Sequence, residues 1–224
     1  MTRCANETDT GQGLGWRPPE PFVIRFETPR LVVRAYELPD AEALFEAVST
    51  SREHLLPWMP WAKEGHTDIA SSTHYIATQI MALRDPAKFN NVGIGIFEKA
   101  TGRLLGGTGV HGVHRDTATA EVGYWIRADA VGKGFCTEAT AGVLSWALGA
   151  QGTGGLGLQR IVIYCSAKNA ASQRIPEKLS LHKEVHQRED YFVLGVGCTD
   201  RLGWGVIATE WDCTNHRRLV LQVT

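Results

Sequence analysis

Two helices are predicted before the main sheet of this chain. The apolar residues of segments 41–48 and 69–83 recur every three or four positions, which is typical of one buried helix face. A strand is predicted ahead of both helices, at residues 31–36, where Leu31, Val32 and Val33 follow one another. The chain therefore begins with a strand followed by helices.

From residue 91 the apolar positions alternate with a period of two. Val92, Ile94 and Ile96 alternate with glycines, and a turn at residues 100–102 leads into the next apolar run. Further strands are predicted through residues 104–114 and 120–126. Strands joined by such short turns run antiparallel, so the centre of the chain predicts an antiparallel meander.

The pattern changes again after residue 131, where a glycine pair opens a helix. A buried strand is predicted at residues 161–164, after a glycine-rich linker at 152–157 that is longer than a usual helix-to-strand connection. The last expected elements are a helix at 170–179 and strands at 191–197 and 204–211. This order predicts the α/β class with a mixed sheet.

Length and composition indicate one catalytic-sized domain. A chain of 224 residues with 43% hydrophobic content can bury a full core. Residues 1–21 are rich in Thr, Gly and Pro and lack apolar periodicity, so we expect a flexible N-terminal tail there and a single domain over residues 22–224.

The charge balance and the cysteine pattern indicate which binding partners and which cellular compartment to expect. Lys and Arg number 23 against 24 Asp and Glu, so no positive field favours nucleic acid. The longest apolar run is far shorter than the roughly 20 residues of a membrane-spanning helix, and the N-terminus lacks an apolar signal segment. The five cysteines are scattered and odd in number, without a CxxC pair. We therefore expect a cytoplasmic protein without nucleic-acid, membrane or metal partners.

The segment Gly132-Lys133-Gly134-Phe135-Cys136-Thr137 carries the clearest candidate chemistry. It lies between a strand and a helix, where several backbone N–H groups converge before the helix supplies them with acceptors. Glycines let the backbone approach an anion closely, so the segment predicts a phosphate site. Taken alone, a GxG is more often an ordinary turn, and its flanks decide between the two interpretations.

Four motifs in order give the chain a resemblance to the GNAT superfamily of N-acetyltransferases, and to its Rim-type members. The loop and the preceding Glu121-Val122-Gly123-Tyr124-Trp125-Ile126 resemble the acetyl-CoA diphosphate loop and its strand. The other motifs that carry the resemblance are Thr28-Pro29-Arg30-Leu31 with Arg34, Leu56-Pro57-Trp58-Met59-Pro60-Trp61, and Asn169-Ala170-Ala171-Ser172 with Pro176-Glu177-Lys178-Leu179. Together they span residues 27–211.

The resemblance implies a GNAT fold, which is a mostly antiparallel sheet with one splayed parallel strand pair and flanking helices. It also implies acetyl-CoA as co-substrate, bound without a metal. The residues implied to hold it are the backbone of Tyr124, Trp125 and Ile126, the amides of Gly132, Lys133, Gly134, Phe135, Cys136 and Thr137, and the side chains of Asn169 and Ser172. Two departures are Asp129, where the superfamily has Gln or Arg, and Ser180-Leu181, where it usually has Gly-Phe.

Glu121 and Ser172 are the candidate catalytic side chains. Glu121 lies in an otherwise apolar strand, where partial desolvation would raise its pKa toward that of a general base. The alternative is a carboxylate paired with a surface cation such as Arg115. Ser172 is the candidate general acid, because Pro176 replaces the tyrosine of many GNAT enzymes. Its alternative role is a hydrogen bond to backbone or phosphate.

Other polar and aromatic residues carry weaker signals. Trp58 and Trp61 are held in a loop by prolines, and either wall a peptide groove or belong to the core. Cys136 at a helix start could suggest a nucleophile, but direct transfer needs none. His111 and His114 are three apart on a strand, which would send them to opposite faces and argues against a metal pair.

The function predicted is transfer of an acetyl group from acetyl-CoA to an amine. By resemblance to Rim-type enzymes, the acceptor is the N-terminal α-amine of a protein or peptide. A small-molecule amine acceptor, such as an antibiotic, a polyamine or an amino-acid derivative, is the first alternative, and a non-catalytic acyl-CoA-binding module is the second. Whether the chain forms a homodimer is left open.

Overall fold

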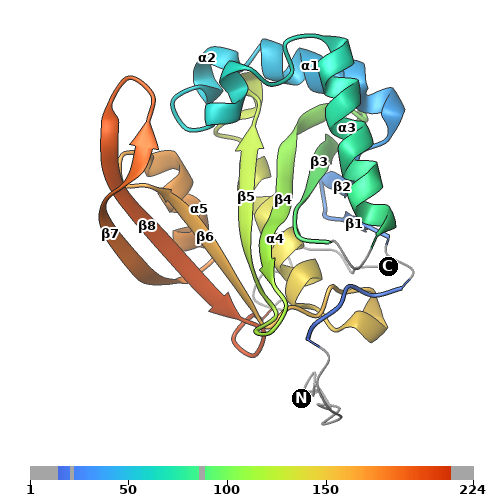
Figure 1. The fold of residues 1–224 in the computed structure, drawn as a ribbon, viewed down its shortest axis with the longest axis vertical. Helices are drawn as coiled ribbons and strands as arrows, with labels where there is room; N and C mark the ends of the chain where they lie inside the picture. Colours follow the sequence, from blue (N-terminus) through green and yellow to red (C-terminus); the bar gives the residue numbers. More distant parts are fainter. Residues whose placement is uncertain (1–14, 21–22, 86–88, 213–224) are drawn as a thin grey trace.

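The computed structural model describes residues 15–20, 23–85 and 89–212, which form one eight-stranded sheet with helices on both faces (Figure 1). The strand order is β1-β2-β3-β4-β5-β6-β8-β7. The strands are β1 (Arg25–Glu27), β2 (Leu31–Ala35), β3 (Val92–Glu98), β4 (Leu104–His114), β5 (Thr119–Ile126), β6 (Arg160–Ser166), β7 (His182–Val193) and β8 (Gly197–Ile207). Neighbours are antiparallel except for β5 and β6, which are parallel. The predicted mixed α/β sheet is confirmed.

Helices occupy the positions that the apolar spacing predicts. The α-helices are α1 (Ala41–Ser49), α2 (Arg52–Leu55), α3 (Ile69–Arg84), α4 (Phe135–Leu148) and α5 (Ala170–Lys178). Short 3-10 turns are η1 (Leu38–Asp40), η2 (Pro60–Lys63), η4 (Ala128–Ala130) and η5 (Gln151–Thr153). No helix among the described residues is long and apolar enough to cross a membrane.

The sheet separates two hydrophobic cores. On one face, alternate residues of β3 such as Ile94 and Ile96 pack with Val143 and Trp146 of α4. On the other face, Tyr36 and Phe97 pack in a smaller core with α1 and α3. Because successive side chains of a strand point to opposite faces, each central strand contributes to both cores. We call the face toward α1 and α3 the helix-α1 face and the face toward α4 the helix-α4 face.

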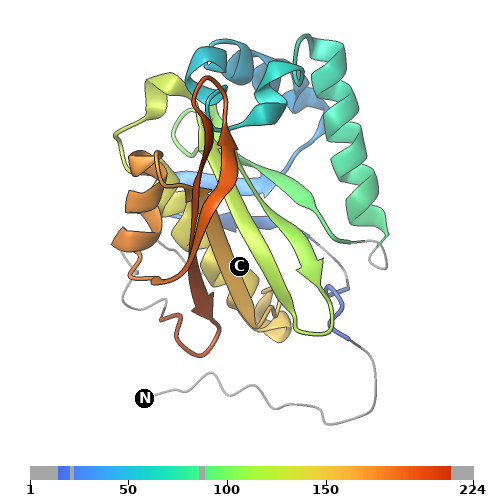
Figure 2. The ribbon, with the colours of Figure 1, turned by 60° about the vertical axis from the view of Figure 1, so that its left-hand side comes forward.

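The last two strands do not have the predicted bounds. β7 begins at His182, before the predicted residue 191, and β8 begins at Gly197 and ends before Trp211. β7 is an edge strand with mostly exposed side chains, so its polar sequence gives no apolar alternation to read. In Figure 2 the two strands form a long hairpin that runs past α5.

The glycine-rich segment after α4 turns back onto the end of that helix. The N–H groups of Leu156, Gly157 and Leu158 donate to the carbonyls of Trp146, Gly149 and Ala147, with N–O distances of 2.8, 2.8 and 2.9 Å. Helix carbonyls at a C-terminus need such partners. The linker therefore caps α4 and leads into β6.

Part of the predicted N-terminal tail contacts the domain. Trp16 donates its indole N–H to the Leu156 carbonyl at 3.0 Å, and its ring lies 6.0 Å from that of Phe89. These contacts lie on the N-terminal side of the predicted domain boundary at residue 22. The rest of the tail prediction, residues 1–14 and 21, lies outside the described residues.

Candidate active site

The loop before α4 presents backbone N–H groups toward solvent. Gly132 and Gly134 adopt left-handed conformations, with φ of 76° and 79°. The first helical hydrogen bond of α4 runs from the Glu138 N–H to the Gly134 carbonyl at 3.0 Å. Within the described part of the chain, the N–H groups of residues 132–137 have no protein acceptor. Free donors at the positive end of a helix form a site for phosphate oxygens.

The strand that leads to this loop separates from its parallel neighbour. β5 pairs with β6 at Thr119, Ala120 and Glu121, and no pairing follows although β5 continues to Ile126. Figure 1 shows the two strands meeting near the β4–β5 turn and diverging toward α2. One edge of β5, from Val122 to Ile126, therefore carries backbone groups that no strand of the described sheet pairs with.

Glu121 is the last β5 residue before the strands diverge. Its side chain is exposed, and partial desolvation nevertheless raises its pKa, while the charge of Arg201 on β8 lowers it. The cation that the sequence offered, Arg115, is occupied elsewhere, because its guanidinium donates to the carbonyls of Trp16 and Phe89. A carboxylate with a raised pKa beside an open strand edge can accept a proton.

His111 lies directly opposite Glu121, and the sequence alone did not place it there. β4 and β5 pair at His111 with Glu121 and at His114 with Thr119, with a bulge between them. Thr119 and Glu121 share one face, so the bulge brings both histidines to that face, and the prediction of opposite faces is wrong. Desolvation lowers the pKa of His111, which favours its neutral form. No group of residues suited to a metal ion occurs in the described chain.

Ser172 and Tyr124 meet on the helix-α4 face of the divergence. The Ser172 hydroxyl donates to the Tyr124 hydroxyl at 3.3 Å, and the Tyr124 hydroxyl donates to the Ser172 carbonyl at 3.2 Å. Burial raises the pKa of Tyr124, so the phenol stays protonated near neutral pH. Asn169 caps α5, with its side-chain oxygen accepting the Ser172 N–H at 3.0 Å. Tyr124 thus contributes a side chain where only its backbone was predicted to act.

Comparison with known proteins identifies the family. The sequence model described as "Acetyltransferase (GNAT) domain" matches residues 30–182. The chain belongs to the GNAT acetyltransferase family. It is 27% identical to the "Putative ribosomal N-acetyltransferase YdaF" of Bacillus subtilis (strain 168) over 183 residues, which is 81% of this chain and 93% of that protein.

Solved structures confirm the GNAT fold. Mycobacterium smegmatis RimJ in complex with CoA-disulfide superposes with a TM-score of 0.73 at 21% identity, covering 89% of this chain and 94% of that one. The ribosomal-protein-S5-alanine acetyltransferase of Vibrio fischeri superposes with a TM-score of 0.72 at 19% identity, covering 84% and 99%. The predicted splayed strand pair and flanking helices are confirmed, and the chain is an acetyltransferase.

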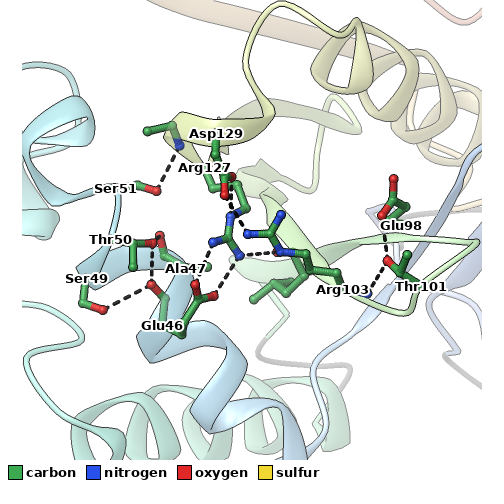
Figure 3. Close-up of polar contacts among 12 residues, drawn as sticks. Glu46, Ala47, Ser49, Thr50, Ser51, Glu98, Thr101, Arg103, Arg127 and Asp129 are labelled. Atoms are coloured by element: carbon green, nitrogen blue, oxygen red, sulfur yellow. Dashed lines mark hydrogen bonds and ion pairs between the residues drawn. The ribbon is translucent and has the colours of Figure 1, made fainter.

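Asp129, where the GNAT superfamily has Gln or Arg, is held by two arginines (Figure 3). Arg103 Nη2 and Arg127 Nε each lie 2.6 Å from one of its carboxylate oxygens. Arg127 also donates to both carboxylate oxygens of Glu46 on α1, at 2.8 and 2.7 Å, and its side chain is buried. The hydrogen bond from Arg103, aided by Arg127, lowers the pKa of Asp129. The departure therefore adds no unpaired negative charge before the GNAT loop.

Ser180 is a second departure from the GNAT pattern, and Cys136 is the rejected candidate nucleophile. Ser180 stands where the superfamily has glycine and takes a left-handed conformation, φ 57°, as α5 ends. Such a conformation costs a non-glycine residue about 1–2 kcal/mol. Burial raises the pKa of Cys136 to about 12, so its thiol is neutral near pH 7 and is not an activated nucleophile.

Trp61 lies over the helix-α1 face beside β5. Its ring centroid is 5.9 Å from that of Trp125 and 5.7 Å from that of His66, both in edge-to-face arrangements. Its side chain remains exposed at 38%, which is unusual for so large an apolar group. Trp58, in the loop between α2 and η2, is partly buried. The structure therefore places at least Trp61 where an acceptor of this GNAT enzyme could contact it.

Replacing Trp61 or Trp58 by alanine is expected to raise the acceptor KM about tenfold, because an aromatic contact contributes about 1 kcal/mol beyond its buried area. Acetyl-CoA affinity should stay within twofold of wild type. Steady-state kinetics with both substrates measure the two effects. Trp146→Phe is the control, because Trp146 is buried against Phe26 and should affect only thermal stability. Equal losses of stability and of both affinities in the loop variants would instead mean core packing.

Proposed function

We propose that this acetyltransferase transfers the acetyl group of acetyl-CoA to the N-terminal α-amine of a protein or peptide. One observation carries the proposal. The unpaired edge of β5 connects the free amides of the glycine loop, past Ile126, with Glu121 at the point where β5 and β6 diverge. A phosphate site and a proton acceptor therefore lie at the two ends of one open strand edge.

The residues present fit acetyl-CoA. The amides of Gly132, Lys133, Gly134, Phe135, Cys136 and Thr137 would hold the diphosphate, and the backbone of Tyr124, Trp125 and Ile126 would pair with the pantetheine arm. Asn169 has its side-chain NH2 left for the cofactor, because its oxygen accepts the Ser172 N–H. The relative RimJ was solved with a CoA disulfide, which supports this assignment.

Acetyl transfer needs a base for the amine, an acid for the departing sulfur, and alignment of the amine with the thioester. Acetyl-CoA supplies an acyl thioester. Glu121, directly or through one water, removes a proton from the attacking amine, and its raised pKa suits that task. Ser172 is the candidate donor to the departing sulfur, and to donate there its hydroxyl proton turns away from the Tyr124 hydroxyl, 3.3 Å distant. Neutral His111 opposite Glu121 adds no positive charge that would repel an ammonium.

The α-amine is favoured because it is the easier amine to deprotonate. An α-amine has a pKa near 8 and a lysine side chain one near 10.4, so deprotonation at pH 7 costs about 1.4 and about 4.6 kcal/mol. A single carboxylate base is enough to deprotonate the α-amine. The names of YdaF and of the Vibrio fischeri enzyme both refer to ribosomal acceptors, which supports a protein substrate.

An amine panel tests this proposal. Release of free CoA thiol is measured at pH 7.5 with a peptide bearing a free N-terminus, the same peptide blocked at its N-terminus but carrying lysine, spermidine and an aminoglycoside. The free-terminus peptide is expected to react fastest by kcat/KM. Preference for spermidine or the aminoglycoside would establish a small-molecule acceptor instead, and no release with any amine would contradict the proposed activity.

A further inference from the structure

One arginine, directly before β2, contacts the glycine loop with its side chain. Arg30 Nη1 donates to the Lys133 carbonyl at 3.0 Å, and its Cζ lies 4.4 Å from the centroid of the Phe135 ring. Arg30 belongs to the Thr-Pro-Arg-Leu motif of the sequence, to which the proposed reaction assigns no role. The contact links the first half of the chain to the candidate phosphate site.

Arg30 is anchored by a buried carboxylate. Its Nε and its backbone N–H donate to Glu138 at 2.6 and 2.8 Å, and the Thr28 hydroxyl donates to the same carboxylate at 2.5 Å. Glu138 is 2% exposed and lies in the first turn of α4. A buried carboxylate that accepts three hydrogen bonds, one from a guanidinium, fixes both partners firmly.

The bond to the Lys133 carbonyl sets the direction of a loop donor. A trans peptide is planar, with its C=O and N–H pointing in opposite directions. The Lys133 C=O points at Arg30, so the N–H of Gly134 points away from it. Without this hydrogen bond the peptide between Lys133 and Gly134 rotates more readily, because Gly134, with a φ of 79°, populates both signs of φ.

The guanidinium also brings a positive charge to the loop. Arg30 Nη2 lies 3.5 Å from the position that a Cβ on Gly134 would take, and none of the described residues accepts a hydrogen bond from Nη2. Arg103 and Arg127, the nearby cations at position 129, are already paired with carboxylates. Arg30 therefore has an N–H group left for a phosphate and, unlike the exposed Lys133 of the loop itself, is held in place by a buried carboxylate.

We propose that Arg30 is the positioning residue of the diphosphate loop. Held by Glu138, it orients the peptide between Lys133 and Gly134 so that the Gly134 N–H faces the diphosphate of acetyl-CoA, and it places its positive charge beside that diphosphate. The inference rests on the proposed function, because it assumes that acetyl-CoA occupies the loop. It assigns the Thr-Pro-Arg-Leu motif to cofactor binding.

Two acyl donors separate this role from a general structural one. Acetyl-CoA carries the diphosphate, and acetyl-pantetheine carries the same thioester without it. Arg30→Gln is expected to raise the KM for acetyl-CoA about tenfold, with kcat within twofold, as expected for loss of one charge-assisted contact. The kcat/KM for acetyl-pantetheine should not change. Arg30→Lys should fail to restore the KM, because an ammonium cannot bond Glu138 and the Lys133 carbonyl in one fork.

Arg25→Gln is the matched control. Arg25 lies on β1 and pairs with Glu27 at the surface, away from the loop, so this variant should keep the wild-type KM for both donors. If Arg30→Gln does not fold because Glu138 is left buried and unpaired, the double variant Arg30→Gln with Glu138→Gln replaces the ion pair by neutral groups. The double variant should fold and show the same selective loss with acetyl-CoA.

The outcomes are distinct. An unchanged KM for acetyl-CoA in folded Arg30→Gln, or equal losses with both donors, would overturn the role of Arg30. Full rescue by Arg30→Lys would overturn the positioning step, because charge alone would then suffice. Failure of the wild-type protein to bind acetyl-CoA by calorimetry would instead overturn the proposed function.

Discussion

Gly134→Val is expected to weaken acetyl-CoA binding about 10- to 100-fold. Gly134 has a φ of 79°, which a β-branched residue adopts at a cost of about 1–3 kcal/mol. The protein would avoid that cost by changing the loop, and the amides would then no longer converge. A side chain here would also stand 3.5 Å from Arg30 Nη2, in the space proposed for the diphosphate. Titration calorimetry with acetyl-CoA measures the change.

Gly102→Val separates loss of binding from backbone strain. Gly102 has a similar φ of 72° in the β3–β4 turn, and no atom lies within 4 Å of the position of its Cβ. This variant should lose comparable thermal stability and keep its affinity for acetyl-CoA. If Gly134→Val also keeps its affinity, the diphosphate does not bind this loop and the cofactor assignment is wrong.

Glu121→Gln is expected to lower kcat about 100-fold at pH 7, within the range usual for loss of a general base. Acetyl-CoA affinity should remain within twofold, because the proposed role of the carboxylate is to deprotonate the acceptor and not to bind the cofactor. The residual activity should recover as the pH rises above about 8, where the α-amine loses its proton unaided. Initial rates with the free-terminus peptide between pH 5.5 and 9.5 measure both effects.

The activity of the wild-type protein is expected to fall at low pH. As the proposed general base, Glu121 accepts a proton only when it is ionised, so activity is expected to fall as the pH decreases through its pKa. Desolvation raises that pKa, so the fall begins at a higher pH than an ordinary glutamate would give. Glu184→Gln is the control, because Glu184 pairs with Arg160 near the sheet edge and should leave the profile unchanged. A Glu121→Gln variant with wild-type turnover and profile would show that Glu121 is structural.

The sequence was most informative where the signal is local. The period of two at Val92, Ile94 and Ile96 and the glycine pair before α4 depend on neighbouring residues, and the structure has both. Glu121 became a candidate general base for a similar reason, because it is a carboxylate within an otherwise apolar strand. That role stays a prediction. The bounds of α1, α3 and α5 agree with prediction to within a residue for the same reason.

Features that depend on distant parts of the chain could not be predicted. Arg30 and Glu138 are 108 positions apart, and no spacing rule connects them. The neutralisation of Asp129 needs Arg103, which comes from another strand. His111 faces Glu121 only because of a bulge, and a bulge changes register without a clear mark in the sequence.

β5 limits where this chain can change in length. Its residues alternate between the two faces of the sheet, with Val122 on the helix-α4 face and Trp125 on the helix-α1 face. One residue inserted into β5 would reverse every position beyond it, and the polar and apolar sets would exchange faces. β4 already accommodates an extra residue in its bulge, beside the turn at residues 115–118, in which Asp116 and Thr117 are exposed. Insertions and deletions are therefore compatible with that turn and bulge, whereas the chain between Glu121 and Ile126 has a fixed length.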